Sequence, residues 1–320
     1  MRVLVLTAQA RVPDLSAVYA SLPQHLDVEV RVLEKAQQRN LRTYLHALDI
    51  GSFARILLDL PFKHMVRQAA LLSRLSGLLI YEEDACQNYL ATSKWQGAFS
   101  RFYRRLPAAR IVVTGASVAR RLRAEGFDAT FMPKGYDPRL LFDEQAVRDV
   151  ELGFIGRTAS RDYAGRRDLL EQLSACEPLM VLRTEPGADY RRGLNSIRYF
   201  VSADVGLGEY MAKNFEAMAC GCVLLAWRQG EEEQAIGLEN GRHLLLYSSL
   251  AELRGHLTRL RAEPALAEQL AAEGKAFVAG RLSHVRLAER LANVLRESWP
   301  IKPAPSRWQR LCALFDLRSG

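Results

Sequence analysis

Midway along the chain stands Glu151-Leu152-Gly153-Phe154-Ile155-Gly156, a short apolar run that ends in glycine. The chain opens on a similar run, Arg2-Val3-Leu4-Val5-Leu6-Thr7. Continuous apolar runs of this length are typical of strands that are buried on both faces of a parallel sheet. Because the second run begins the same pattern again, we predict two α/β domains.

Strand-like and helix-like segments alternate after each of these runs. In the first half, strands are predicted at 28–33, 55–60, 78–81, 110–114 and 129–132, with helices at 64–75 and 118–125. In the second half, strands are predicted at 179–183, 204–207, 223–227 and 244–247, with helices at 167–175 and in a tail from 250 to about 298. Alternation of this kind predicts parallel sheets with helices on both faces.

The predicted fold class is therefore α/β, with two Rossmann-like domains that face each other across a cleft. We place the first domain at 1–147 and the second at 148–299. Three prolines begin the remaining segment, and an amphipathic stretch at 308–315 follows them. Because this stretch is too short to be a stable helix alone, we expect 300–320 to dock back on the first domain.

The composition is that of a soluble globular protein, with 49% hydrophobic and 25% charged residues. We find no secretory signal and no apolar stretch as long as a membrane span. Five cysteines, an odd number, indicate a reducing compartment. No set of Cys and His residues has the spacing of a four-ligand metal site. We therefore expect a cytoplasmic protein that needs no metal.

The net charge of +8 is concentrated in one part of the chain. Residues 94–139 contain ten Lys or Arg residues and only three acids. Such a patch predicts a polyanionic partner, which could be phosphate groups, an anionic membrane or nucleic acid. Within 94–110 the basic and aromatic residues alternate, as in Phe99, Arg101, Phe102, Tyr103, Arg104 and Arg105. No nucleic-acid-binding motif accompanies them, so we expect this segment to contact an anionic membrane, on its inner face, or a phosphorylated glycan rather than nucleic acid.

Three loops after predicted strands contain side chains suited to chemistry, because ligands bind beyond the carboxyl ends of parallel strands. The first loop begins at Gly156 and contains Arg157, Arg161 and Arg166 before a predicted helix. Guanidinium groups and helix amides together suit a diphosphate. We add Arg183, at the end of the next predicted strand. The alternative is a basic loop that is only solvated, since Gly-x-Gly-x-x-Gly is absent.

The second loop leads into a predicted helix that starts near Lys213 and continues through Asn214, Phe215 and Glu216. Lys213 and the free amides of the first turn can bind phosphate. The Glu216 carboxylate can accept hydrogen bonds from two ribose hydroxyls, and we assign Asn214 and Phe215 to the same binding site. The alternative is that Glu216 only complements the helix dipole.

The third loop is Glu82-Glu83-Asp84, three acids that follow a predicted strand of the first domain. Carboxylates in this place can bind the hydroxyls of a substrate, and one of them could serve as a base. We take Asp84 as the candidate. The alternative is an acidic turn that is only solvated.

The helix of the second loop also resembles a known family. The run Phe215-Glu216-Ala217-Met218-Ala219-Cys220-Gly221 resembles the donor-binding helix of GT-B glycosyltransferases of the family 4 type. The likeness is greatest to the "group 1" domains related to spore-maturation glycosyltransferases. Three further segments are similar in the same order, at 133–137, 153–157 and 241–247. The resemblance covers roughly 130–295, and it implies a GT-B fold in which Glu216 binds the ribose of the donor.

The sequence departs from this family in two places. Many members have two glutamates with seven residues between them, whereas Glu209 and Glu216 have six between them. Glu209 is therefore taken as a stand-in for the residue that faces the transferred sugar. The glycine-rich turn that often follows the first strand is replaced by Thr7-Ala8-Gln9-Ala10-Arg11.

The expected function is transfer of a sugar from a nucleoside diphosphate sugar to a glycan or lipid-linked acceptor. Arg157, Lys213 and Arg166 would stabilise the charge on the leaving diphosphate, so that neither metal nor cofactor is needed. The resemblance implies retention of configuration and a place in bacterial cell-envelope polysaccharide or lipopolysaccharide synthesis. The alternatives are a nucleotide-sugar epimerase on the same scaffold and a non-catalytic module that binds a sugar nucleotide. A basic nucleic-acid-binding protein is a third alternative.

Overall fold

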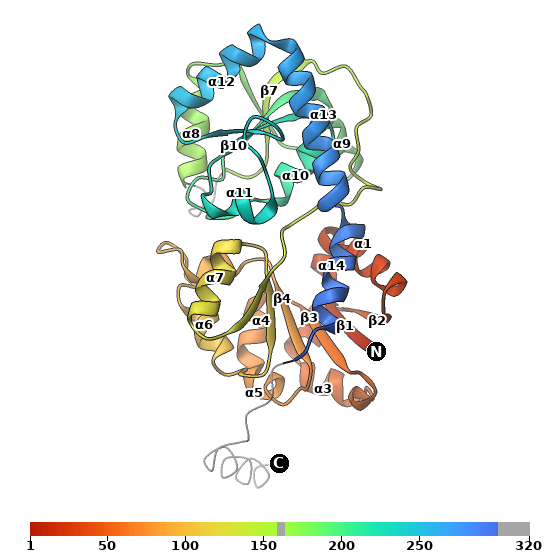
Figure 1. Ribbon diagram of the computed structural model, residues 1–320. Helices are drawn as coiled ribbons and strands as arrows, with labels where there is room; N and C mark the ends of the chain where they lie inside the picture. Colours follow the sequence, from red (N-terminus) through yellow and green to blue (C-terminus); the bar gives the residue numbers. More distant parts are fainter. Residues whose placement is uncertain (159–163, 300–320) are drawn as a thin grey trace.

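The computed structural model describes residues 1–158 and 164–299 of the 320-residue chain. Two α/β domains are stacked one above the other, each built around a parallel sheet (Figure 1). The predicted α/β fold class is thus confirmed. In the part of the chain that the structure describes, no helix is both long and apolar enough to cross a membrane.

The first domain contains a six-stranded sheet in the order β2-β1-β3-β4-β5-β6. Its strands are β1 (Arg2–Ala8), β2 (Asp27–Leu33), β3 (Arg55–Asp59), β4 (Leu78–Glu82), β5 (Arg110–Val113) and β6 (Asp128–Phe131). The helices between them are α1 (Val12–Ser21), α2 (Lys35–Arg39), α3 (Leu41–His46), α4 (Phe62–Met65), α5 (Ala69–Leu72), α6 (Ala98–Tyr103) and α7 (Ala116–Ala124). All paired strands are parallel, as their apolar character predicts.

The single helix predicted at 64–75 is instead two short helices, α4 and α5, with a 3-10 turn at Val66–Gln68 between them. The side-chain amide of Gln68 explains the break. It accepts a hydrogen bond from the Leu41 amide and donates to the carbonyl oxygen of Gln38. These contacts tie Gln68 to a neighbouring segment and compete with a continuous helix.

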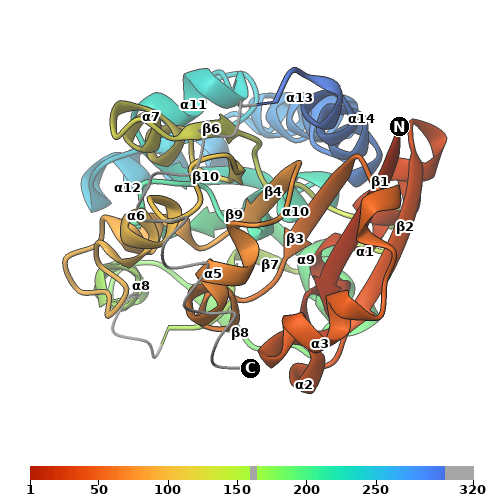
Figure 2. The ribbon, with the colours of Figure 1, turned by 90° about the horizontal axis from the view of Figure 1, so that it is seen from below.

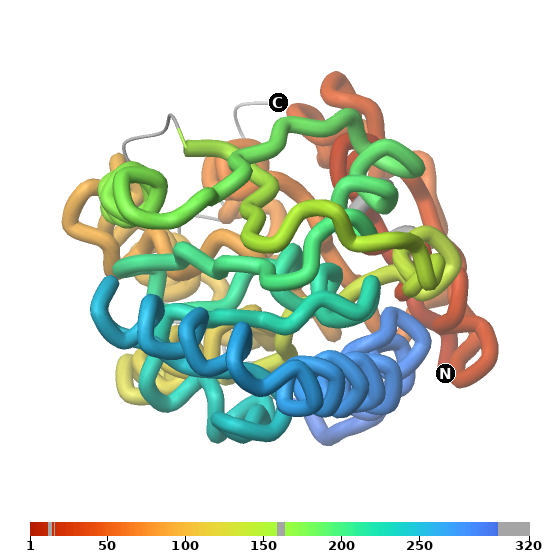
Figure 3. The backbone as a smooth tube through the Cα atoms, turned by 90° about the horizontal axis from the view of Figure 1, so that it is seen from above, coloured from red at the N-terminus to blue at the C-terminus, as the bar shows by residue number. Residues whose placement is uncertain are grey.

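The second domain contains a five-stranded sheet in the order β11-β10-β9-β7-β8. Its strands are β7 (Val150–Ile155), β8 (Leu179–Leu182), β9 (Ile197–Ser202), β10 (Val223–Trp227) and β11 (Leu245–Tyr247). Its helices are α8 (Ala164–Ser174), α9 (Ala188–Ser196), α10 (Ala212–Ala219), α11 (Glu231–Ile236), α12 (Leu250–Ala262) and α13 (Pro264–Arg281). Seen from above, α12 and α13 run along one side of this sheet (Figure 3).

The strand predicted at 204–207 is wrong, because the strand in this region is β9 at Ile197–Ser202. Gly206 and Gly208 have φ angles of 76° and 68°. This left-handed conformation suits glycine and is incompatible with a strand. The segment from Asp204 to the start of α10 is therefore a loop, and it projects from the carboxyl end of the sheet toward the first domain.

The chain returns to the first domain through α14 (His284–Arg296), which lies beside α1 (Figures 1 and 2). Leu287, Leu291 and Leu295 are buried with Val3 and Val5 of β1 in one apolar cluster. Residues 284–296 fall in the range predicted for the second domain, yet they pack on the first. The predicted docking segment, 300–320, lies outside the described residues.

The two segments that join the domains cross at Gly135. A Cβ atom on Gly135 would lie 2.1 Å from the carbonyl oxygen of Leu282, so only glycine fits there. The Tyr136 amide donates to the same carbonyl, and the His284 amide donates to the carbonyl of Tyr136. These contacts hold the start of α14 against the segment that leaves the first domain.

The aromatic residues predicted to alternate with arginines on a membrane-facing segment have a different role. Phe99, Phe102 and Tyr103 are buried in the core of the first domain. Arg101 and Arg105 are exposed on the same segment. The helical turn of α6 separates the two sets, because residues three or four positions apart share a face.

Candidate functional site

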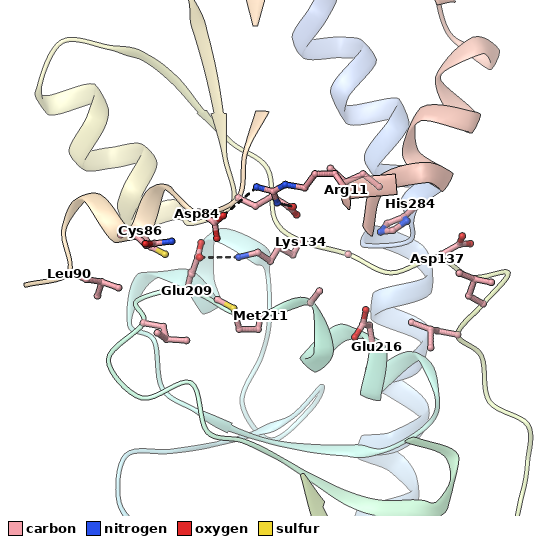
Figure 4. Close-up of a pocket in the computed structure, with 18 residues that line it drawn as sticks. Arg11, Asp84, Cys86, Leu90, Lys134, Asp137, Glu209, Met211, Glu216 and His284 are labelled. Atoms are coloured by element: carbon pink, nitrogen blue, oxygen red, sulfur yellow. Dashed lines mark hydrogen bonds and ion pairs between the residues drawn. The ribbon is translucent and has the colours of Figure 1, made fainter. Parts of the chain in front are cut away.

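A cavity of about 480 Å³ lies between the two domains, at the carboxyl ends of both sheets (Figure 4). Parallel α/β sheets bind ligands at this end of their strands. The first domain and its returning helix line the cavity with polar residues from several loops, Arg11, Glu83, Asp84, Lys134, Asp137 and His284. The second domain lines it with residues around the start of α10, Leu207, Glu209, Met211, Ala212 and Glu216.

Arg11 is the central cation of the first-domain wall. It lies in the turn after β1, where the sequence departs from the glycine-rich pattern of the family that it resembles. Its guanidinium pairs with Glu83 and with Asp84 at 3.3 Å, and it lies 3.8 Å from Asp59 and 4.0 Å from Glu82. Burial disfavours the charged form, but the surrounding carboxylates outweigh it and raise the pKa of Arg11. Because carboxylates surround this cation, the first-domain wall is a poor place for a diphosphate.

Two of the three predicted acids, Glu83 and Asp84, line the cavity, whereas Glu82 lies behind them. The Asp84 side chain is 55% exposed and reaches the cavity mouth. Burial, followed by the charge of Asp84, raises the pKa of Glu82 to about 8. At neutral pH Glu82 is therefore mostly protonated, and Glu83 and Asp84 supply the negative charge of this loop.

Glu209 belongs to the second domain but is held by groups of the first. Lys134 Nζ lies 2.9 Å from Glu209 Oε1 (Figure 4). Thr114 Oγ1 donates to Glu209 Oε2 at 3.1 Å. Burial disfavours the Lys134 cation, but the Glu209 carboxylate outweighs this effect and raises the pKa of the lysine. Both oxygens of Glu209 thus have partners from the facing domain.

Glu216 lines the cavity from the first turns of α10, as the sequence predicted for a ribose ligand. The hydroxyl of Tyr190, on α9, donates to Glu216 Oε2 at 2.6 Å. Burial and the nearby Glu216 charge raise the pKa of Tyr190 well above its ordinary value, so the hydroxyl stays a donor. Tyr190 therefore orients the Glu216 carboxylate at the cavity edge.

The structure does not bring Asn214 and Phe215 to the cavity, although both were predicted to bind the donor. Phe215 is fully buried in the core of the second domain. The Asn214 side chain donates to Asp204 Oδ2 at 2.7 Å. Successive residues of a helix point about 100° apart, so the residues next to Lys213 and Glu216 face the sheet instead.

Arg166, predicted to bind phosphate, is an internal residue with a side chain only 2% exposed. Its Nη2 lies 2.6 Å from Asp204 Oδ1, and its Nη1 donates to the carbonyl of Arg157 at 3.0 Å. Asp204 also accepts from Asn214 and from the Met211 amide. Arg166 and Asp204 therefore shape the two donor-side loops, and the buried acid directly after β9 was not recognised from the sequence.

Lys213 lies at the start of α10, and its Nζ is 4.7 Å from the centre of the Phe154 ring. In the described ranges 1–158 and 164–299, no carboxylate lies within 4.0 Å of this ammonium. Burial lowers the pKa of Lys213 to about 8, with Arg166 acting in the same direction and Asp204 and Glu216 opposing it. Lys213 is thus a half-buried cation that has an aromatic ring beside it but no ion-pair partner.

Gly156, at the end of β7, leaves room for this lysine. A Cβ atom on Gly156 would lie 2.5 Å from Lys213 Nζ, and the φ angle of 153° also favours glycine. Free helix amides, an ammonium and an open glycine turn together form a site that suits an anion. Lys213 lies beside the cavity rather than on its wall, since Met211, Ala212 and Glu216 are the α10 residues that line it.

Comparison with known proteins identifies the second half of the chain. Residues 166–295 match the protein family described as "Glycosyl transferase-like". This segment is a glycosyltransferase domain. A comparison with curated protein sequences finds no match.

Solved structures extend the likeness of this glycosyltransferase domain to the whole fold. Sucrose-phosphate synthase from Thermosynechococcus elongatus superimposes with a TM-score of 0.65 at 13% identity, over 92% of this chain and 98% of that one. HepE from Anabaena, in complex with UDP and glucose, has a TM-score of 0.67 at 13% identity, over 93% and 100%. A glycosyltransferase from Rickettsia africae has a TM-score of 0.64 at 10% identity, over 92% and 97%. These structures confirm the predicted GT-B fold, and the family match at 166–295 supports the predicted enzyme class, a glycosyltransferase.

The remaining predicted residues of the glycosyltransferase domain lie around its sheet edge. Arg157 is exposed directly after Gly156, and Arg183 is exposed after β8. Arg161 lies outside the described residues. Within the described part of the chain, no group of three or more His, Cys, Asp or Glu side chains could hold a metal ion. The local sequence pattern identified Gly156, Lys213 and Glu216 as site residues. No sequence pattern marked Arg11, Lys134 or Tyr190 as part of the site.

Proposed function

We propose that the protein transfers a sugar from a nucleoside diphosphate sugar to a hydroxyl of a glycan or lipid-linked acceptor. The observation that supports this most is Lys213, a half-buried ammonium beside Gly156 that has no carboxylate partner among the described residues. An unpaired buried cation is costly, and a diphosphate would supply the missing charge. Glu216 lies three positions further along the same helix, so it shares a face of α10 with Lys213.

The donor would lie against the second domain. Lys213, the amides at the start of α10 and Arg157 would stabilise the charge that develops on the leaving diphosphate. Glu216, oriented by Tyr190, would accept hydrogen bonds from the ribose hydroxyls. HepE was solved with UDP-glucose and Staphylococcus aureus TarM with UDP, which makes uridine the first nucleobase to test.

The acceptor would lie against the first domain, with Asp84 at the cavity mouth as its hydroxyl ligand or base. The resemblance to family 4 glycosyltransferases supports retention of configuration at the sugar. It also supports a role in bacterial cell-envelope polysaccharide or lipopolysaccharide synthesis, on the cytoplasmic side of the membrane.

The basic face of the first domain would meet the anionic surface of that membrane. Exposed cations on α6, α7 and the turns beside them form this face, Lys94, Arg101, Arg104, Arg105, Arg121 and Arg123. Attraction to anionic lipid contributes about 1 kcal/mol per basic residue near the surface. Sedimentation with anionic liposomes should fall on charge reversal of Arg101, Arg104 and Arg105, and unchanged sedimentation would exclude this face.

The ribose assignment is tested by calorimetry with two ligands, UDP and 2′,3′-dideoxy-UDP. For the wild type, we expect UDP to bind about tenfold more tightly, because a hydrogen bond to a charged group contributes about 1.5–3 kcal/mol. Glu216→Ala should bind the two ligands equally and as weakly as the wild type binds the dideoxy form. Tyr190→Phe is the matched control and should keep most of the preference. A Glu216→Ala variant that still prefers UDP would contradict the assignment.

A non-catalytic sugar-nucleotide-binding module is a second candidate, favoured by the state of Glu209. Both of its oxygens already have partners, Lys134 and Thr114, so it does not present a free carboxylate to a transferred sugar. Release of UDP from UDP-sugars in the presence of acceptor extracts distinguishes the two. Binding without release would favour the module, and release of altered sugar nucleotide without any acceptor would favour an epimerase.

A further inference from the structure

The first turn of α11 has three consecutive acids, and each has a different partner. Glu233 stays within its own domain, where it accepts from Tyr210 at 2.8 Å. Glu231 is exposed and pairs with Arg120 of α7, also at 2.8 Å. Glu232 is fully buried and also reaches the first domain. The middle acid therefore lies inside the contact between the domains, where α11 faces α7 (Figure 1).

Glu232 binds the N-terminus of α7 with both carboxylate oxygens. Its Oε2 accepts from the Ala116 amide at 2.9 Å, and its Oε1 accepts from the Ser117 amide at 2.8 Å. The first amides of a helix have no partner within the helix. The N-cap residue of α7 is Gly115, which has no side chain to supply one. Glu232 thus provides the helix cap that the first domain lacks, and its charge complements the helix dipole.

The capped turn also contacts the Glu209 loop. Ser117 Oγ donates to the carbonyl of Gly208 at 3.2 Å, and Thr114 binds Glu209. A Cβ atom on Gly115 would lie 3.0 Å from Glu209 Oε2, so the loop and the turn are in close contact. Burial raises the pKa of Glu232, and the two amide hydrogen bonds oppose that shift. If the domains separated, the carboxylate and both amides would have to return to water.

We propose that Glu232 is an interdomain latch, a helix cap supplied by the second domain that holds the cleft closed. In the closed form Glu209 meets Lys134 and Thr114, so Glu232 is a positioning residue for the cavity although it does not line it. This inference goes beyond sugar transfer, since it concerns the closed arrangement of the domains whatever ligand the cleft binds. Glu231, next to it but exposed, offers a matched control.

Hydrogen exchange and small-angle X-ray scattering on the full chain test the latch. In Glu232→Ala we expect exchange to rise about tenfold at 115–118, because loss of an N-cap costs about 0.5–2 kcal/mol. Exchange should also rise at 207–210 in the other domain, and the radius of gyration should increase. Glu231→Ala should change neither, since an exposed pair contributes little. A local cap without a latch function would change exchange at 115–118 alone.

A second variant removes the donor instead of the acceptor. Ala116 is the first residue of α7, where proline is favoured, and Gly115 has the extended backbone that a residue before proline needs. Ala116→Pro therefore removes one amide and places its ring where the Glu232 carboxylate lies, without disturbing the helix itself. It decides the question even if Glu232→Ala fails to fold. We expect Ala116→Pro to raise hydrogen exchange at 207–210. The variant with both Ala116→Pro and Glu232→Ala should show little further increase, because both substitutions remove the same contact. If both variants had the same radius of gyration as the wild type and the same hydrogen exchange at 207–210, the latch proposal would be overturned.

Catalytic assays provide a separate readout. If the proposed transfer reaction holds, Glu232→Ala should lower kcat while the Kd for UDP stays within about twofold of the wild type. An inactive wild-type protein would count against the proposed function and leave the exchange and scattering results to decide the latch alone.

Discussion

A cation on each wall of the cleft, Arg11 or Lys213, has a different electrostatic environment. Arg11, on the first domain, has four carboxyl groups within 4.0 Å, of which Glu82 is mostly protonated at neutral pH. Lys213, on the second domain, has the Phe154 ring and no carboxylate within that distance among the described residues. The pKa of Arg11 is raised by its neighbours, whereas the pKa of Lys213 is lowered to about 8 by burial.

We interpret this contrast as the difference between a cation that stabilises the fold, Arg11, and one that is proposed to bind a ligand, Lys213. The Arg11 charge is neutralised within the protein, so its role is to hold the acidic loop at 82–84 in place. The Lys213 ammonium has no carboxylate partner in the part of the chain that the structure describes, and a buried cation without one costs folding free energy unless an anion binds. This contrast supports the proposal that the diphosphate binds on the second-domain wall and the acceptor on the first.

The largest expected effect is the loss of stability when Arg11 is replaced. Arg11→Met should lower the free energy of unfolding by about 3–5 kcal/mol, because it leaves buried carboxylates without their cation. Urea denaturation at pH 7 measures this effect. Arg120→Met removes only the exposed pair with Glu231 and should cost less than about 1 kcal/mol. Equal losses in the two variants would show that the Arg11 cluster has no special importance for folding.

A smaller effect of opposite sign is expected at Lys213. Its pKa is about 8 in the folded protein and 10.5 when exposed, so the unfolded chain binds the proton more tightly. Below pH 8 the whole of this unfavourable contribution to the free energy of folding is present. It disappears as the pH rises from 8 to 10.5. Lys213→Met should therefore stabilise the unliganded protein by about 1–3 kcal/mol at pH 7 and by little near pH 10. Denaturation at both pH values checks the sign, and a variant less stable than the wild type at pH 7 would contradict it.

The sequence predicted most of the fold, because buried parallel strands are apolar along their whole length. The strand at 204–207 was predicted wrongly because apolar residues alternate there with Gly206 and Gly208. The sequence does not show that these two glycines have a left-handed backbone. The helical tail was predicted, but the partner of α14 was not. Periodicity shows that a helix has an apolar face and does not show which domain the face will meet.

The candidate site was predicted only where the signal was local. Lys213 and Glu216 belong to one helix start, and their spacing is visible in the sequence. Arg166 was expected to bind a ligand, but its partner Asp204 is 38 positions away in the chain, and sequence spacing cannot show that they meet. The same holds for Glu209 and Lys134, which the closure of two domains brings together across 75 positions.

The most direct test of the central claim is the affinity for UDP, measured by calorimetry at pH 6.5 to 9.5 with the wild type and Lys213→Met. If Lys213 binds the diphosphate, wild-type affinity falls as the pH rises above about 8, where the unliganded lysine loses its proton. Lys213→Met should bind UDP about tenfold to a hundredfold more weakly at pH 7, and its affinity should lack the fall near pH 8 that the wild type shows. Equal affinities and equal pH profiles for the two proteins would contradict the assignment of the diphosphate to this wall.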